Sequence, residues 1–177
     1  GDFRECMRLM DTEDIDYNIV HSNVKQNYFY FFALGILPHN HSKALEVAER
    51  LIDNGVDYHF TDKNGNNLLM LLTKRHAYNL FDFFLNKINW QERNNDSDDI
   101  MDVAIKSGNT KAISLLIKNG YTVTQNNIIK ALQLQNGSTF KELIKSTYQF
   151  CAQDLFFITN AEKHVQFHLN LLEHYKD

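Results

Sequence analysis

The 177-residue sequence predicts an all-α fold, a solenoid of stacked antiparallel helix pairs that are joined by short hairpin loops. One proline and seven glycines are too few turn-forming residues for an all-β chain, which needs a turn about every 8–12 residues. Apolar residues instead recur at the spacing of one helix face, in successive pairs of stripes. The pairs repeat about every 33 residues, and a fixed period of this size is typical of repeat architectures.

The clearest helix pair lies within residues 99–120. Its two apolar stripes consist of Ile100, Met101, Ala104 and Ile105, and of Ala112, Ile113, Leu115, Leu116 and Ile117. Ser107-Gly108-Asn109 separates the stripes, and Asn119-Gly120 after the second stripe indicates a helix C-cap with glycine in the left-handed conformation. The segment therefore predicts a helical hairpin.

A similar pair precedes this hairpin. The apolar residues 68–72 and 80–85 predict its two helices. Ile88 occupies the position in this unit that Gly120 occupies in the next unit, 32 residues further along the chain. In the pair before that, the second helix is expected over residues 42–54, with Ser42 as its N-cap and Gly55 as its end, 33 residues before Ile88. Its first helix is the apolar run 28–34, and residues 35–41 form an enlarged loop because Pro38 disfavours continuation of a helix.

The downstream residues predict a shorter pair and a terminal unit. Apolar residues at 128–132 and 140–144 predict two helices, but Met101 aligns with Ile129 at an offset of only 28, so the projecting loop, or finger, before them should be stunted. Apolar residues from Leu155 to Tyr175 fit a terminal unit that covers the open end of the core. We expect one domain over 1–177, with units at 1–18 (partial), 19–60 (with the insertion), 61–92, 93–125, 126–149 (shortened finger) and 150–177 (C-terminal cap).

Three segments carry motifs of a known repeat: Asp62-Lys-Asn-Gly65-Asn-Asn-Leu-Leu69, Asn54-Gly-Val-Asp57-Tyr-His, and residues 104–123. They resemble the Asp-x-x-Gly-x-Thr-Pro-Leu-His opening, the ending and most of one unit of the ankyrin repeat. The Thr-Pro-Leu-His signature itself is replaced by Asn67-Leu-Leu-Met70 and by Asp99-Ile-Met-Asp102. The chain is therefore similar to a divergent ankyrin-repeat protein.

The resemblance implies a protein-interaction module, because stacked units of this kind form a long concave surface that binds proteins. We expect a monomer that binds a protein partner and holds no cofactor. Tyr58 and Phe60, near a finger base, fit either packing or contact. Carried over position by position, the family's contact surface falls on Thr61, Lys63, Asn64, Asn66, Lys74, Arg75, Asn94, Asn95, Asp96, Asp98, Lys106 and Ser107.

Composition and charge exclude several partners. Lys+Arg 18 against Asp+Glu 22 gives a net charge of −4 without a basic run, which argues against nucleic acid. The longest uncharged apolar run, residues 28–37, is too short to cross a bilayer, so we expect no membrane partner. Two distant cysteines, Cys6 and Cys151, favour a reducing compartment and a cytoplasmic location. The chain begins at Gly1 without a methionine, so we interpret it as a fragment of a longer protein.

Residues that could carry chemistry fit structural roles better. His164 and His168 are four residues apart on an expected helix, but the glutamate of a His-Glu-x-x-His motif is absent, and we expect no metal. Cys151 lies in an apolar stretch that fits buried packing, since a reactive thiolate needs a cationic setting. The carboxylates at 96–99 fit a helix N-terminus better than a calcium loop, whose distal glutamate is missing. We therefore expect no enzymatic activity.

Other hypotheses stay open. The repeats could be the substrate-targeting part of an enzyme whose catalytic part lies outside this fragment, or a hydrolase could use Cys151 as its nucleophile. The loop at 35–41 competes with the fingers as a functional site. Finally, 20 Asn and 13 Lys against 5 Arg suggest an AT-rich genome, and divergent ankyrin repeats of such composition resemble secreted effectors of intracellular bacteria or ankyrin proteins of large DNA viruses. Such an effector would act on host proteins in the host cytoplasm.

Overall fold

The computed structural model describes residues 8, 16, 28–35 and 41–146. The elements in chain order are α2 (Tyr28–Gly35), α3 (His41–Asp53), α4 (Leu68–Lys74), α5 (Tyr78–Leu85), α6 (Ile100–Lys106), α7 (Thr110–Lys118), α8 (Gln125–Gln133) and α9 (Gly137–Leu143). The extended pairing among these residues is one isolated antiparallel bridge between Thr61 and Asn67. The predicted all-α fold of repeated helix pairs is confirmed. Within the described ranges, no helix has the length and apolar character that crossing a membrane requires.

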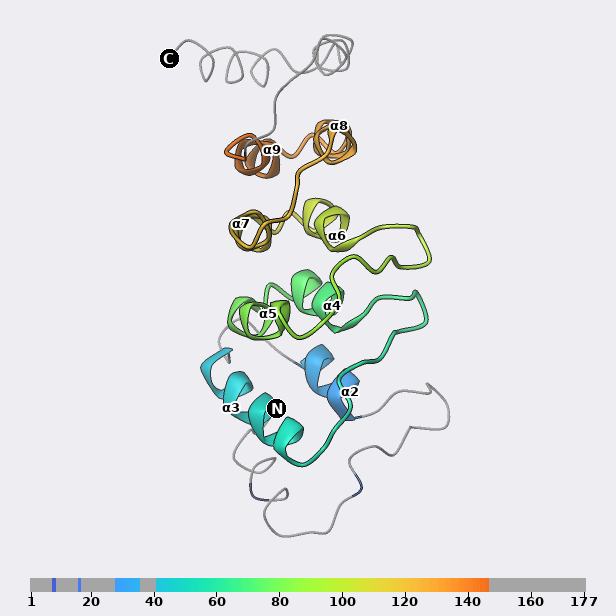
Figure 1. Cartoon of the computed structure of the whole chain (residues 1–177), viewed down its shortest axis with the longest axis vertical. Helices are drawn as coiled ribbons and strands as arrows, with labels where there is room; N and C mark the ends of the chain where they lie inside the picture. Colours follow the sequence, from blue (N-terminus) through green and yellow to red (C-terminus); the bar gives the residue numbers. More distant parts are fainter. Residues whose placement is uncertain (1–7, 9–15, 17–27, 36–40, 147–177) are drawn as a thin grey trace. The chain divides into compact units, whose positions relative to one another are not determined.

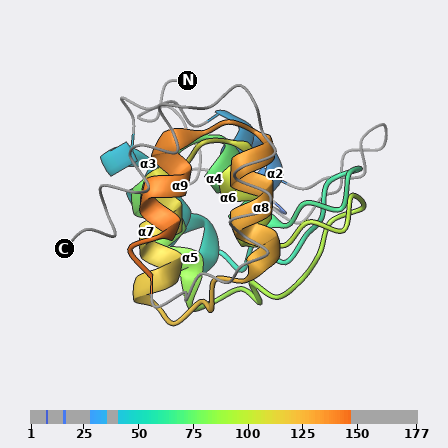
Figure 2. The ribbon, with the colours of Figure 1, turned by 90° about the horizontal axis from the view of Figure 1, so that it is seen from above.

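The chain divides into two compact units, Gly1–Val103 and Ala104–Asp177, and the division falls within α6. In the first unit α4 packs against both α2 and α5, and α3 packs against α5. Figure 1 shows α2 and α4 in one row and α3 and α5 in a second row. Residues 54–67 and 86–99 leave these rows as two projecting loops, which we call the first finger and the second finger (Figure 2).

The core of the first unit is aromatic and aliphatic. Phe29 of α2 and Phe84 of α5 are fully buried and pack edge to face, with ring centroids 5.5 Å apart. All residues of α4 from Leu68 to Thr73 are buried, because this helix lies between α2 and α5. A helix that is covered on several sides needs apolar residues around its circumference, which explains the run Leu-Leu-Met-Leu-Leu at its start.

The second unit contains α7, α8 and α9, and α9 packs against both other helices. The stripes predicted at 112–117 and 128–144 supply its core, although some of their members are only half-buried. The connection between α7 and α8 comprises only residues 119–124, so it is much shorter than either finger. The fully or almost fully buried apolar side chains of these helices are Ala112, Ile113, Leu116, Ile128, Ala131, Phe140 and Leu143.

The turn between the two helices of a pair has the same backbone in three successive pairs. Its middle residue adopts a left-handed conformation, with φ of 55° at His76, 67° at Gly108 and 56° at Gln135. The next N–H group then donates to a carbonyl five residues earlier, which closes the preceding helix. These hydrogen bonds are Ala77 to Leu72 at 3.0 Å, Asn109 to Ala104 at 2.9 Å and Asn136 to Ala131 at 3.3 Å.

Two boundaries predicted around Pro38 are wrong. The helix α2 extends through Gly35, and α3 begins at His41, so Ser42 lies inside α3 and is not its N-cap. Proline removes one N–H donor and restricts the residue before it, but neither effect reaches three residues further along the chain. Gly35 and His41 of the predicted 35–41 loop are therefore helical, and residues 36–40 lie outside the described residues.

Several other predictions concern residues that the structure does not describe. They are the C-terminal unit 150–177 with Cys151, His164 and His168, and the N-terminal unit 1–18 apart from residues 8 and 16. The division into repeat units within one domain also stays a prediction.

Candidate functional site

The tip of the first finger is a tight turn that Asp62 holds. Its Oδ1 atom accepts hydrogen bonds from the backbone N–H groups of Asn64 and Asn66, both at 2.8 Å. The N–H group of Asp62 donates in turn to the carbonyl oxygen of Asn66 at 2.9 Å. Aspartate suits this position because its carboxylate satisfies N–H groups that a reversing chain leaves unpaired. Gly65 completes the turn with a φ of 75°, which glycine adopts without a steric penalty.

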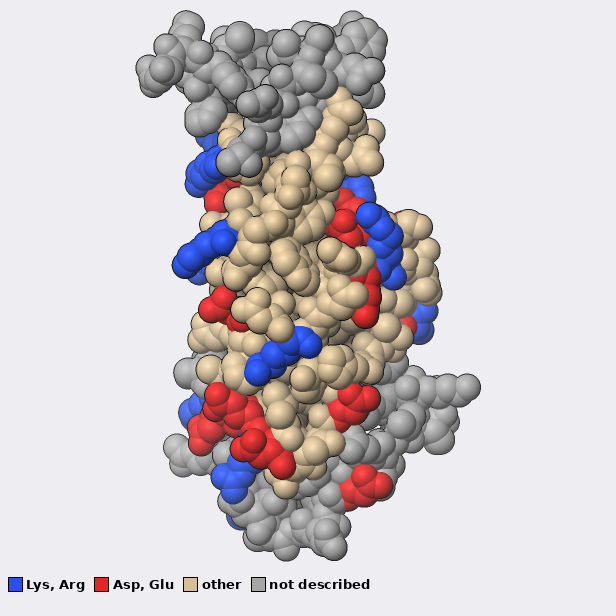
Figure 3. All heavy atoms as spheres, in the orientation of Figure 1, with Lys and Arg blue, Asp and Glu red and all other residues tan. Residues whose placement is uncertain are grey.

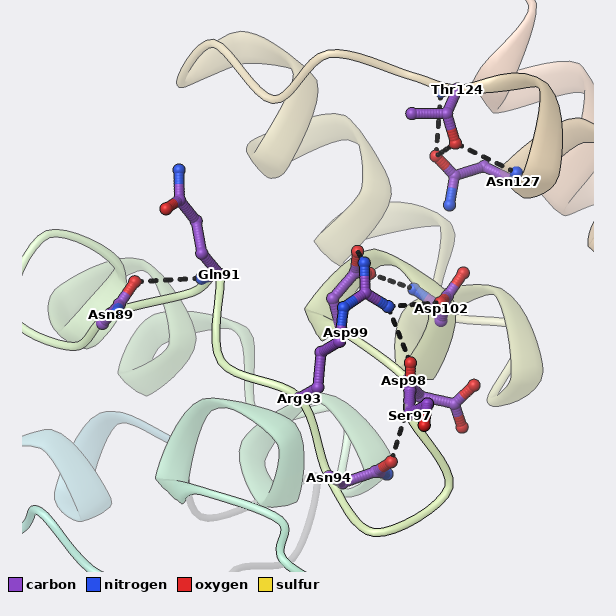
Figure 4. Close-up of polar contacts among 10 residues, drawn as sticks. All are labelled: Asn89, Gln91, Arg93, Asn94, Ser97, Asp98, Asp99, Asp102, Thr124 and Asn127. Carbon is purple, nitrogen blue, oxygen red and sulfur yellow. Dashed lines mark hydrogen bonds and ion pairs between the residues drawn. The ribbon is translucent and has the colours of Figure 1, made fainter.

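The second finger repeats this turn 32 residues later, with Asn94 in the place of Asp62 (Figure 4). Asn94 Oδ1 accepts hydrogen bonds from the backbone N–H groups of Asp96 and Asp98, both at 3.0 Å. The N–H group of Asn94 donates to the carbonyl oxygen of Asp98 at 3.0 Å. Ser97 takes the place of Gly65, with a φ of 62°. Both turns therefore require a side-chain oxygen at their first position.

Direct hydrogen bonds join the two fingers. The backbone N–H group of Asn95 donates to the carbonyl oxygen of Asn64 at 2.9 Å. Its side-chain Nδ2 donates to the carbonyl oxygen of Lys63 at 3.1 Å. Nearer the helices, Asn94 Nδ2 donates to Oδ1 of Asn66 at 3.0 Å. These bonds link residues about one repeat apart and make the two fingers a fixed pair.

Three cationic side chains lie on and beside the first finger. Lys63 is at its tip, whereas Lys74 and Arg75 are at the C-terminal end of α4, and all three are exposed. The ammonium group of Lys74 donates to Oδ1 of Asn66 at 3.0 Å, and Asn66 is fully buried. Within the part of the chain that the structure describes, none of the three cations has a carboxylate at ion-pair distance.

The cation of the second finger is compensated. Arg93 Nη1 donates to the carbonyl oxygen of Ser97 at 2.7 Å, and the guanidinium lies 3.5 Å from the carboxylate of Asp99 and 3.9 Å from that of Asp102 (Figure 4). Asp99 Oδ1 also accepts from the N–H group of Asp102 at 3.0 Å, which confirms the predicted helix-terminal role of this acid. Basic and acidic side chains accordingly lie next to each other along this finger in Figure 3. Among the described residues, no three potential metal ligands come together.

A comparison with protein families decides which repeat this is. Residues 39–127 match the family model of ankyrin repeats in three copies. The chain belongs to the ankyrin repeat family. Ankyrin repeats are in general protein-interaction modules and typically non-catalytic scaffolds.

Solved ankyrin repeat domains have the same fold. The ankyrin repeat domain of Bcl-3, a member of the IkappaB protein family, gives a TM-score of 0.63 at 16% sequence identity, over 84% of this chain and 68% of that chain. An ankyrin repeat domain from Acinetobacter baumannii AYE gives a TM-score of 0.59 at 18% identity, over 81% of this chain and 74% of that chain. At these identities the likeness concerns the fold alone. Comparison with curated proteins finds no match.

The site residues predicted from the ankyrin resemblance differ in exposure. Asn66, Asn94 and Asp98 are buried, since their polar groups hold the finger turns and join the fingers, so the structure gives them a supporting role. Ser107 is half-buried. Lys106 and Ser107 belong to the second compact unit, and all the others belong to the first. The exposed residues are Thr61, Lys63, Asn64, Lys74, Arg75, Asn95, Asp96 and Lys106, whose contact with a partner stays a prediction.

Sequence reasoning missed the contributions of Asp62 and Arg93. Asp62 was visible as the start of a turn signal. Arg93 is an isolated cation in the sequence, and its carboxylate partners are Asp99, just before α6, and Asp102 in the first turn of α6. Tyr58 and Phe60 are half-buried and take part in packing, while their contact with a partner stays a prediction. The ring of Tyr58 lies 5.2 Å from that of Phe84, and the ring of Phe60 lies 5.6 Å from that of Tyr30.

Proposed function

We propose that this ankyrin repeat chain binds a partner protein through the exposed surface of its two fingers and the adjoining end of α4. The fixed pair of fingers is the observation that supports the proposal. Buried polar groups such as the side chain of Asn66 are used within the pair, whereas Lys63 and Asn95 at the tips remain exposed. A surface that is ordered before association loses less conformational freedom when a partner binds.

The exposed side chains of this surface are polar and of both charges. Lys63, Lys74 and Arg75 are cationic, Asp96 is anionic, and Asn64 and Asn95 carry amides. Charged and amide groups in fixed positions favour recognition of a protein, since they give orientation and specificity. A nucleic acid would need a continuous row of cations along its phosphates.

By repeat correspondence, we propose Lys106 and Ser107 as the equivalent contact residues of the second compact unit. They follow Lys74 and Arg75 by 32 residues, so they occupy the same two positions at the end of the next first helix. Thr61, at the start of the first turn, completes the set.

The test is to capture a partner and to change the surface. The combined Lys63→Ala, Lys74→Ala and Arg75→Ala variant should bind a captured and purified partner about tenfold more weakly or worse, because truncation of an interface hot spot costs about 2 kcal/mol. Its thermal midpoint should barely change, since exposed substitutions usually stay within about 0.5 kcal/mol. The matched control is Lys87→Ala, Lys118→Ala and Lys141→Ala, which removes three exposed cations in or just after second helices of the pairs.

Normal binding by the finger variant would place the partner elsewhere. Loss of binding on shortening the loop around Pro38 would then assign the contact to that loop. Equal weakening by both triple variants would mean that the partner responds to net charge and not to this surface.

Two wider roles are compatible with the same surface. The Asn- and Lys-rich, Arg-poor composition suggests an AT-rich genome. Together with the divergent repeats, it supports the role of a pathogen effector that acts on a host protein in the host cytoplasm. A partner captured from host-cell lysate but not from bacterial lysate would support this role. The alternative, a targeting domain of a larger enzyme, predicts that the captured partner is that enzyme's substrate.

A further inference from the structure

We infer that the partner presents an acidic segment to the first finger, with its carboxylates on Lys63, Lys74 and Arg75. The inference rests on the proposed function, because it names the chemistry of the partner at that surface. It concerns the first compact unit only, to which all three residues belong.

The charge of the first finger and α4 is not balanced locally. Residues 54–76, which comprise the first finger and α4, contain these three cations and two carboxylates, those of Asp57 and Asp62. Both carboxylate oxygens of Asp62 accept from Asn66 Nδ2, at 3.1 and 2.9 Å, and Oδ1 also accepts two backbone N–H groups. The Asp62 carboxylate is therefore engaged in holding the turn. The Asp57 carboxylate accepts from the backbone N–H group of His59 at 2.8 Å, whereas the three cations remain exposed.

The ammonium group of Lys74 is positioned without being neutralised. Its partner is the amide oxygen of Asn66, which is buried and also accepts from Asn94 Nδ2 at 3.0 Å. A neutral amide fixes the lysine but leaves its charge uncancelled, and an ammonium group has three donors. A carboxylate from outside the chain would add the missing counter-charge to a side chain that is already ordered.

The second finger has the opposite balance. Residues 86–103, from the start of this finger to the end of the first compact unit, contain five carboxylates and two cations, and Arg93 is paired with Asp99 and Asp102. Asp96 is exposed at the tip, next to Asn95, which contacts the first finger. A nucleic-acid backbone that runs across both fingers would meet this acidic neighbour, whereas an acidic segment short enough to stay on the first finger avoids it. The net charge of −4 for the whole chain disfavours binding of long polyanions.

A purely structural role for the cations predicts something different. Lys74 and Arg75 lie at the C-terminal end of α4, where positive charge is favourable for the helix. That role affects stability but gives no affinity for acidic peptides. Binding of such a peptide therefore separates the two explanations.

The experiment is an NMR titration of the isotope-labelled chain with oligoglutamate, and with oligolysine and a single-stranded oligonucleotide as comparison probes. Oligoglutamate should shift the backbone signals of residues 61–76 most strongly and leave those around Lys87 unchanged. Lys74→Gln should weaken its binding about fivefold at low salt, and about 0.5 M salt should weaken it similarly, because exposed charges are screened. Arg75→Gln provides a second variant, since its side chain has no hydrogen bond among the described residues.

Arg93→Gln and Lys87→Gln are the matched controls, because each removes one exposed cation that already has a partner. Arg93 is ion-paired, and the ammonium group of Lys87 lies 4.8 Å above the ring of Phe83.

The inference is wrong if the controls weaken oligoglutamate binding as much as Lys74→Gln and Arg75→Gln do, if oligoglutamate produces no shifts at 61–76, or if the oligonucleotide binds there more tightly. A captured partner that depends on the fingers but tolerates Lys74→Glu would overturn this inference and leave the proposed function standing. A partner that does not need the fingers would overturn the proposed function, whatever oligoglutamate does.

Discussion

Asp62 and Asn94 differ in charge, yet each supports the same turn through one side-chain oxygen. The turn therefore selects a hydrogen-bond acceptor and not a carboxylate. Gly65 and Ser97 also share a left-handed backbone, so a side chain is tolerated there at a strain of about 1 kcal/mol. Gly65 has a further constraint. A Cβ atom at this position would lie 2.5 Å from Asn95 Oδ1 and 2.9 Å from the Asn95 backbone nitrogen.

We expect Gly65→Ala to lower the free energy of unfolding by about 2 kcal/mol or more, because strain and a steric overlap with the second finger act together. Gly55→Ala is the control, since Gly55 has the same φ of 75° but an added Cβ atom would meet nothing within 4 Å. It should lose only about 1 kcal/mol. Urea unfolding measures both values, and equal losses would show that the contact between the fingers imposes no requirement at Gly65.

A buried hydroxyl group in α9 gives a prediction of the opposite sign. Thr139 is fully buried, and its Oγ1 atom has no hydrogen-bond partner among the residues that the structure describes. Thr139→Val keeps the shape and removes the unpaired polar group, so stability should rise by about 1 kcal/mol. Thr139→Ser keeps the hydroxyl group, loses a buried methyl group and should be less stable than the parent. A loss of stability in the valine variant would mean that the hydroxyl group is hydrogen-bonded in solution.

The local chemistry of the fingers could be predicted from the sequence, whereas their burial could not. The turn at Asp62 to Gly65 follows from residue types that act over a few positions. The hydrogen bond from Asn94 to Asn66 joins residues 28 apart, and only stacking of the fingers brings them together. Both were expected on the binding surface because they occupy contact positions carried over from the ankyrin family. Asparagine is mostly exposed in proteins, and the burial of these two depends on contacts that no local pattern records.

The helices that were predicted best have start and stop signals on both sides. For the pair α6 and α7, Asp99 and Gly120 have their expected helix-terminal and left-handed roles. In the predicted separator, Gly108 is also left-handed and Asn109 caps α7. The start of α3 was misplaced because Ser42 has the composition of an N-cap, but the helix already begins at His41. Helix propensities differ by only a few tenths of a kcal/mol between most residues, so extending a helix by one residue changes the free energy very little. A single candidate cap therefore often does not decide where a helix begins.

The contribution of one such cap can be measured in α7. Asn109 Oδ1 accepts from the N–H group of Ala112 at 3.0 Å. Asn109→Ala removes this acceptor, so unfolding should become easier by about 1 kcal/mol, within the range of about 0.5–2 for N-cap losses. Asn109→Ser is the control, because serine also caps helices and should retain most of the stability. If serine and alanine are equally destabilising in thermal unfolding, packing around the side chain matters more than the cap.

The extensive helix contacts join elements that are close in the sequence, such as α4 with α5 and α8 with α9. Stability in such a chain is approximately a sum of terms within units and between nearest neighbours, in contrast to a domain closed by long-range contacts. A local defect should therefore loosen its own neighbourhood and leave distant helices protected.

Leu143→Ala in α9 and Leu80→Ala in α5 test this expectation as a reciprocal pair. Both side chains are almost fully buried, and truncation of a buried leucine costs about 2–5 kcal/mol. Because α9 packs against α7 and α8, Leu143→Ala should accelerate amide hydrogen exchange in these three helices by about thirtyfold or more, while exchange in α4 and α5 keeps its rate. Leu80→Ala should accelerate exchange in α3, α4 and α5 and spare α8 and α9. Equal acceleration of all protected amides by either variant would show that the two compact units unfold as one cooperative whole.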